Sequence, residues 1–148
     1  MSRSDYSSAQ LQQVHASVTG FFQDIGGELL AYGPDQATLG LELLPRHMNN
    51  ASNMHGGVMA TLMDVAMGLC GTWEQDPAER RVALTLSMNI NFSAPAAVGS
   101  RIRAVARCRS GGHKVFMASC DLLDDNDRLI AFGEGVFKRG ARRRELPA

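Results

Sequence analysis

The sequence has few of the features that direct a protein to nucleic acid, to a membrane or out of the cell. Its 148 residues include 15 Lys and Arg and 15 Asp and Glu, so its formal net charge is zero and nothing draws the whole chain to an anionic polymer or surface. It contains no apolar run of about 20 residues, the length that crosses a bilayer. Its N-terminus lacks the basic segment and apolar core of a secretory signal. We therefore expect a cytoplasmic protein with no nucleic-acid or membrane partner.

Cysteine is also scarce, and its pattern argues against a fold held by disulfides or by zinc. The chain has three cysteines, Cys70, Cys108 and Cys120. None belongs to a Cys-x-x-Cys pair and all three lie in apolar-periodic segments, so we expect buried reduced thiols. His15, His47 and His113 do not have the spacing of metal ligands. We expect no metal and no bound cofactor.

Hydrophobic residues make up 45% of the chain and charged residues 20%, a balance typical of a folded soluble domain. The length suits a single domain over residues 1–148. Its core is expected at about residues 27–139, between a polar N-terminal tail and a loose basic tail from Arg139 to Ala148. No internal repeat or linker interrupts it.

The most informative stretch covers residues 49–73. Its first part is polar and turn-forming, and its second part is apolar, with Val58, Leu62, Val65 and Leu69 at helical spacing. This predicts a helix over about residues 57–73 with that stripe facing the core. The first amides of a helix have no partner inside it and carry the positive end of its dipole. A helix that begins at His55-Gly56-Gly57 is therefore a candidate cradle for a partly negative oxygen.

Asp64 is the one charged side chain of this helix. It lies about two turns inside, too deep for an N-cap, on a face of mostly small residues. A carboxylate in apolar surroundings is costly unless it is paired, and its proton affinity is perturbed. Asp64 is therefore either a functional carboxylate or a solvent-exposed residue on the far side of the helix.

The rest of the chain predicts an N-terminal helix and an antiparallel sheet. Leu11, Val14, Val18 and Phe21 or Phe22 predict an amphipathic helix that ends before Gly26. Period-two patterns predict strands over residues 28–32, 37–43, 82–92, 101–109, 114–123 and 128–138. The strand over 82–92 is apolar on one side and small-polar on the other. The fold class is α+β, with an antiparallel sheet wrapped around one long central helix.

Helix and sheet in this order, with a particular motif at the helix start, resemble the hotdog-fold thioesterases. The motif is Asn49-(x)5-His55-Gly56-Gly57-(x)6-Asp64. More narrowly, the chain resembles the phenylacetate-degradation (PaaI-like) acyl-CoA thioesterases, which are related to the 4-hydroxybenzoyl-CoA thioesterases. The resemblance covers residues 27–139 and includes the strand that closes with Phe92-x-x-Pro95.

The resemblance implies a role for each residue of the motif. The Gly56 amide would polarise the thioester carbonyl, assisted by Gly57. Asp64 would attack the thioester carbon or activate a water to do so. In this family that carboxylate comes from the partner subunit, which implies a dimer and points to a homotetramer.

Three further positions match polar residues beside the thioester. Asn49 and His55 would orient substrate and water, and Thr85 would help to hold the water. Each has a structural alternative: His55 as a cap of the turn before the helix, Asn49 as a turn former, and Thr85 as an ordinary sheet residue.

Coenzyme A carries phosphates, which need a basic or amide-rich contact. The candidate is the turn at residues 110–114, whose glycines expose amides to an anion. The candidate residues are Gly111, Gly112, His113, Lys114 and, more weakly, Arg139 and the arginines at 142–144.

The sequence therefore predicts an enzyme that hydrolyses an acyl-CoA thioester to free acid and CoA. The acyl group is an aryl one, such as phenylacetyl or hydroxyphenylacetyl, or a medium-chain one. A non-catalytic acyl-CoA-binding hotdog module is the alternative. A hotdog hydratase or dehydratase ranks below both, because it needs a carboxylate and a histidine as an acid–base pair and His55 lies before the helix.

Overall fold

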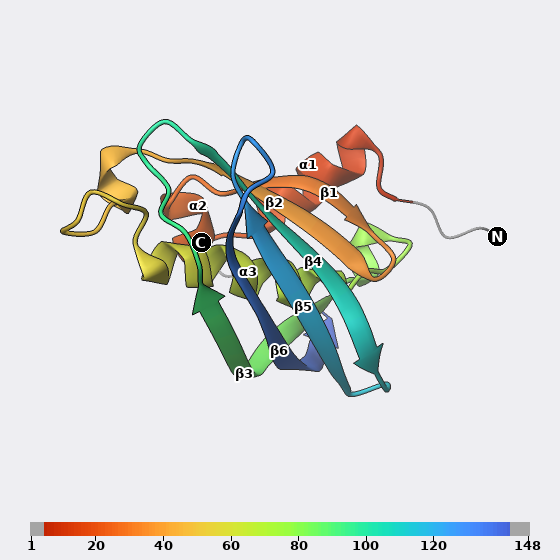
Figure 1. Cartoon of the computed structure of the whole chain (residues 1–148). Coiled ribbons are helices and arrows are strands. Elements are labelled where there is room, and N and C mark those ends of the chain that lie inside the picture. Colours follow the sequence, from red (N-terminus) through yellow and green to blue (C-terminus); the bar gives the residue numbers. More distant parts are fainter. Residues whose placement is uncertain (1–4, 143–148) are drawn as a thin grey trace.

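In the computed structural model, which describes residues 5–142, a six-stranded antiparallel sheet packs around one helix, α3 (Figure 1). The elements are α1 (Ser8–Ser17), α2 (Phe21–Asp24), β1 (Glu28–Gly33), β2 (Gln36–Glu42), α3 (Gly56–Cys70), β3 (Arg81–Phe92), β4 (Arg101–Gly111), β5 (Val115–Leu123) and β6 (Leu129–Arg142), with single 3-10 turns η1 (Pro45–His47) and η2 (Pro77–Glu79). The strand order is β1-β2-β4-β5-β6-β3. Helix α3 contacts all six strands, so the predicted fold class is confirmed.

The buried face of α3 is wider than the predicted stripe and centred elsewhere. Val58 and Val65 are only half buried, whereas the residues that lose nearly all solvent contact include Met59, Leu62, Met63, Ala66, Met67 and Cys70. A curved sheet touches the helix over a broad arc, and unbranched methionine fills the irregular gaps. The methionines of α3 are thus packing residues. The helix also ends three residues earlier than predicted, at Cys70, where an added Cβ on Gly71 would lie 2.2 Å from the Phe116 ring.

The N-terminal helix is split in two, which the sequence pattern did not predict. A capping box between Ser7 and Gln10 begins α1, and α1 ends at Ser17. Gly20 then adopts φ +78°, a left-handed conformation that glycine allows and that a continuous helix does not contain. The second piece, α2, buries Phe22 and leaves Phe21 exposed. No helix within residues 5–142 is long and apolar enough to span a membrane.

Strand β3 contains a bulge that changes which side chains face the helix. Thr85 pairs with Phe137 and Ser87 pairs with Val136, so Leu86 is the extra residue of β3. An inserted residue shifts the period-two alternation by one position. Even-numbered side chains therefore point to one face of the sheet before the bulge and to the other face after it. Thr85, opposite the buried Phe137, therefore faces α3.

The predicted single apolar face of this strand is consequently wrong in its first half. After the bulge, Met88 and Ile90 pack against the core, as the alternation predicts. Before it, Leu84 points to the outer face of the sheet. Leu84 and Leu86 keep 52% and 57% of their surface exposed.

The C-terminal end of the described chain is a strand rather than a loose tail. β6 continues to Arg142, where it pairs with Arg81 of β3. The basic tail predicted from Arg139 is therefore wrong as far as Arg142, because strand pairing with β3 orders these residues. Arg143, Arg144 and the rest of the tail lie outside the described residues.

The three cysteines are free, and Cys70 and Cys120 are buried. Burial raises the pKa of the Cys120 thiol to about 12 and also raises the pKa of Cys70 and Cys108. At neutral pH they are protonated thiols rather than nucleophiles. The prediction of buried thiols is confirmed for Cys70 and Cys120, whereas Cys108 is only half buried.

Candidate active site

The N-terminus of α3 is capped by His55. Its Nδ1 accepts a hydrogen bond from the Gly57 N–H at 2.8 Å, so Nδ1 carries no proton. His55 thus has the capping role that was its structural alternative. The Gly57 amide is occupied by this bond, which leaves the first amide of the helix as the available donor.

Gly56 supplies that amide. Among residues 5–142, no atom accepts a hydrogen bond from the Gly56 N–H. A Cβ placed on Gly56 would lie 3.5 Å from two ring atoms of Phe92, whose side chain is 57% exposed. The end of β3 therefore places an aromatic ring beside an unpaired amide at the positive end of a 15-residue helix, an arrangement that suits a carbonyl oxygen with apolar substituents.

Asn49 belongs to the loop that leads into α3. Its Oδ1 accepts hydrogen bonds from the amides of Ala51 at 2.9 Å and Asn53 at 3.1 Å. The backbone N–H of Asn49 donates to the Asn53 carbonyl. These contacts close the loop, which is the turn-forming role given as the alternative for Asn49.

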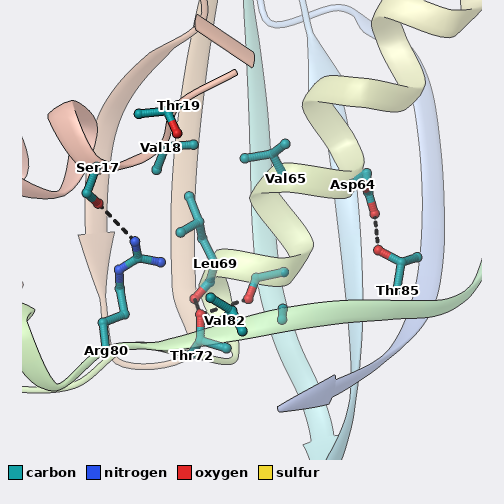
Figure 2. Close-up of a pocket in the computed structure, with 12 residues that line it drawn as sticks. Ser17, Val18, Thr19, Asp64, Val65, Leu69, Thr72, Arg80, Val82 and Thr85 are labelled. Carbon is teal, nitrogen blue, oxygen red and sulfur yellow. Dashed lines mark hydrogen bonds between the residues drawn. The ribbon is translucent and has the colours of Figure 1, made fainter. Parts of the chain in front are cut away.

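Asp64 and Thr85 meet in a pocket beside α3 (Figure 2). The Thr85 hydroxyl donates to Asp64 Oδ1 at 2.6 Å, a contact that exists because the bulge in β3 turns Thr85 toward the helix. Asp64 is half buried and forms no ion pair within residues 5–142. One carboxylate oxygen is fixed by the hydroxyl, and the other remains available for a water or a substrate atom.

The two halves of the predicted site do not come together in one chain. Gly56 and Asp64 are eight residues apart on the same helix, which is about 12 Å along its axis. A reacting atom has to lie within about 3 Å of both the oxyanion donor and the attacking group. One chain therefore does not bring the Gly56 amide and the Asp64 carboxylate to the same reacting atom.

The candidate phosphate contacts lie at the other end of α3. Arg139 donates from Nε to the Gly71 carbonyl at 2.7 Å, and from Nη1 to the Gly112 carbonyl, and its guanidinium lies 4.6 Å from the centre of the Phe116 ring. A Cβ on Gly111 would lie 2.6 Å from the Phe116 Cβ. Packing therefore accounts for Arg139 and Gly111 without a ligand.

The remaining turn residues, Gly112, His113 and Lys114, are exposed, and a Cβ on Gly112 would meet nothing within 4 Å. The structure thus leaves their surface open, while the turn itself is held to α3 by Arg139.

Replacing Arg139 by Met is expected to lower the free energy of unfolding by about 2–4 kcal/mol, because two charge-assisted hydrogen bonds and a cation–π contact are lost while the aliphatic stem is kept. Chemical denaturation measures the change. Arg107→Met is the matched control, since Arg107 is exposed and reaches only Gln36 at 3.4 Å. Equal stability of the two variants would contradict the proposed role of Arg139 in holding the β4–β5 turn to α3.

One residue of the pocket was not identified from the sequence. Arg80 is 6% exposed and lines the same pocket as Asp64. The sequence around Arg80 gives no sign that this arginine is buried. It follows a loop with a proline and precedes a second arginine, and both features are typical of a solvent-exposed turn. Its burial comes from tertiary contacts of α1 that no local periodicity encodes.

Comparison with known proteins agrees with this architecture. The hotdog arrangement is shared with the PaaI protein of the Escherichia coli phenylacetic acid degradation operon, at TM-score 0.78 and 16% identity over 90% of this chain and 94% of that one. Residues 51–131, more than half of the chain, match the thioesterase superfamily. The chain belongs to this superfamily.

Two curated relatives are similar in sequence. Acyl-coenzyme A thioesterase 13 of Mus musculus is 30% identical over 108 residues, which are 71% of this chain and 74% of the relative. The medium/long-chain acyl-CoA thioesterase YigI of Escherichia coli is 27% identical over 133 residues, 81% of this chain and 85% of the relative.

Proposed function

We propose that the protein hydrolyses acyl-CoA thioesters to a free acid and CoA. The observation that carries this proposal is the Asp64–Thr85 pair, a half-buried carboxylate oriented by a hydroxyl inside a pocket of about 280 Å³. The unpaired Gly56 amide at the start of the same helix supplies the second element that acyl transfer needs, a donor for a carbonyl oxygen. The names of the two curated relatives support the acyl-CoA class.

In the proposed mechanism, the Gly56 N–H binds the thioester carbonyl oxygen and stabilises the negative charge that develops on it. Asp64 of the partner chain drives attack on the carbonyl carbon, either directly or by taking a proton from a water. Thr85 holds the carboxylate in place. The C–S bond breaks as the carbonyl re-forms. If Asp64 takes the proton of the attacking water, it passes that proton to the leaving CoA thiolate and the free acid is formed directly. If Asp64 attacks directly, CoA leaves and takes a proton from water, and a water then hydrolyses the acyl–Asp64 anhydride to release the free acid.

The second chain is proposed to add at the edge strand β3. Within the described sheet, β3 pairs with β6 alone, so its other edge presents unpaired backbone groups that a second β3 can satisfy. A two-fold arrangement at this edge places two copies of α3 on the same side of a continuous sheet. This is the geometry that the separation of Gly56 and Asp64 requires.

The proposed tetramer uses the outer face of the sheet. This face carries large exposed apolar side chains, Leu84, Leu86, Val115, Met117 and Phe132, and Met117 also lines a groove of about 590 Å³. Covering them against a second dimer removes apolar surface from water. Sedimentation equilibrium distinguishes the dimer from the tetramer.

Coenzyme A phosphates are proposed to contact the exposed part of the β4–β5 turn, Gly112, His113 and Lys114. Their amides and positive charge suit an anion, and Arg139 and Gly111 support the turn from behind.

The apolar walls of the pocket beside Asp64, which include Val18, Val65, Leu69 and Val82, suit an aryl or medium-chain acyl group.

Free-thiol release from a panel of aryl- and alkyl-CoA thioesters tests the proposed function. Turnover on the panel is the expected result, and the best substrate names the acyl class. Thioesters that bind without thiol release would show a non-catalytic acyl-CoA-binding module instead.

A further inference from the structure

Arg80 carries a buried positive charge without a carboxylate partner. Its Nη2 donates to the Ser17 hydroxyl at 3.1 Å, and none of the ion pairs formed within residues 5–142 involves it. A guanidinium has several N–H donors in a planar fork. The Ser17 hydroxyl accepts from one of them. The other guanidinium nitrogens keep some contact with solvent, although the residue as a whole is only 6% exposed.

The carboxylates of Glu74 and Asp76 act on the same Tyr6 as Arg80 does, but neither forms an ion pair with Arg80. The two phenols close to Arg80 do not neutralise it. Tyr6 and Tyr32 lie near enough for its charge to oppose the effect of burial on their pKa values, yet burial raises the pKa of Tyr6 to about 12 and that of Tyr32 also upward. Both phenols are neutral at physiological pH. A largely buried guanidinium without an ion-pair partner, whose free N–H groups still meet solvent, is placed to bind an anion.

The Arg80 guanidinium and Asp64 share one pocket. Figure 2 shows Arg80 and Ser17 at one end, the Asp64–Thr85 pair at the other, and the apolar Val65, Leu69 and Val82 between them. A hydroxyl of Thr72 also lines the pocket, but it already donates to the carbonyls of α3. The pocket thus has an apolar wall between Asp64 and Arg80 and a cation at the end away from the carboxylate.

We propose that Arg80 binds a carboxylate at the distal end of the acyl group, so that the preferred substrates are CoA monothioesters of dicarboxylic acids. This inference rests on the proposed thioesterase function. The methylene chain would lie along Val65, Leu69 and Val82. The terminal carboxylate accepts from the guanidinium in the bidentate geometry that arginine favours.

The first test compares hexanoyl-CoA with adipoyl-CoA, which have the same carbon count and differ by the terminal carboxylate. Free-thiol release is expected to give a kcat/KM for adipoyl-CoA at least tenfold above that for hexanoyl-CoA. Longer and shorter pairs, such as butyryl with succinyl and octanoyl with suberoyl, locate the optimal length. A preference for the plain acyl thioester in every pair, with hydrolysis that still depends on Asp64, overturns the inference and leaves the proposed function intact.

The second test replaces Arg80 by Met, which keeps the length of the stem and removes the charge. The adipoyl-to-hexanoyl ratio is expected to fall at least tenfold, mostly through KM for adipoyl-CoA. Arg107→Met, the loss of an exposed arginine on β4, is the control and keeps the wild-type ratio. Ser17→Ala breaks the one side-chain contact of Arg80 without removing the guanidinium. If Arg80 were only a clamp for α1, both pocket variants would lose stability alike and neither would change the ratio.

Calorimetry with non-hydrolysable analogues of adipoyl-CoA and hexanoyl-CoA measures binding, so it tests the carboxylate subsite even if the protein has no turnover. The wild-type protein is expected to bind the carboxylated analogue at least tenfold more tightly. Equal affinities would refute a carboxylate subsite. Absence of thiol release from every thioester, with the carboxylate preference retained in binding, would refute the hydrolase proposal alone.

Discussion

Replacing Asp64 by Asn is expected to lower kcat by a factor of about 10²–10⁴, with KM changed by only a few-fold, because general acid–base groups contribute rate enhancements of that size. The amide has the shape of the carboxylate, and its oxygen still accepts the hydrogen bond from Thr85 at the position now held by Oδ1. The substitution removes the negative charge and the basic lone pair while leaving the pocket intact. Thiol release measured over a range of substrate concentrations separates kcat from KM.

The matched control is Glu42→Gln, since Glu42 is an exposed carboxylate on β2, away from the pocket. It is expected to keep the wild-type rate. If Asp64→Asn retained full turnover, the carboxylate would have no part in the chemistry and the assignment of the site to this pocket would be wrong.

Replacing Gly56 by Pro is expected to lower kcat by a factor of about 10²–10³, the typical cost of deleting one oxyanion donor. Proline removes the N–H and is well tolerated at the first position of a helix. His55 already has φ −65° and ψ 135°, the extended conformation that a residue before proline prefers. The helix is therefore expected to form normally without its first amide.

Gly56→Ala provides the comparison that isolates the amide. Its added Cβ would lie at ordinary van der Waals distance, 3.5 Å, from the Phe92 ring, and its N–H is retained. We expect activity close to wild type for alanine and the large loss for proline, with equal helix content by circular dichroism. Similar losses in both variants would mean that bulk beside Phe92, rather than the amide, controls the rate.

Mixing the two inactive chains distinguishes a shared site from a site within one chain. In a random mixture of Asp64→Asn and Gly56→Pro chains, about half of the two-fold dimers are hybrids, and each hybrid has one intact site. Activity is expected to recover to about a quarter of the wild-type value. A mixture as inactive as its components would require both groups to act within one chain, against the helix geometry.

Local periodicity predicted the parts of the fold that repeat. The alternation of β4 and β5 and the long apolar run of α3 fix the class, because a strand or a helix that buries one face shows its period in the sequence. The resemblance gave Thr85 only a role in holding a water, and its hydrogen bond to Asp64 was not predicted. Its physical cause, the extra residue in β3, has no local signature, since Leu86 fits the alternation as well as its neighbours do.

The departures from prediction share an origin in tertiary contacts. Gly20 breaks the N-terminal helix where α2 turns to bury Phe22, and Arg80 is buried by α1 rather than by its own segment. His55 Nδ1 and Asn49 Oδ1 accept hydrogen bonds at the helix start and within the loop, contacts that the motif alone does not specify. A sequence shows which groups are present, whereas the partners that occupy them come from the fold.

The open edge of β3 also has a consequence for the life of the newly made chain. In the proposed dimer a second copy covers this edge, whereas each free monomer displays a strand edge flanked by Leu84 and Leu86, a template for uncontrolled edge-to-edge association. Correct pairing must therefore compete with aggregation during synthesis. Variants that weaken the pairing of two β3 strands are expected to accumulate as insoluble protein. Solubility, rather than the rate of turnover, is then expected to limit which substitutions β3 tolerates.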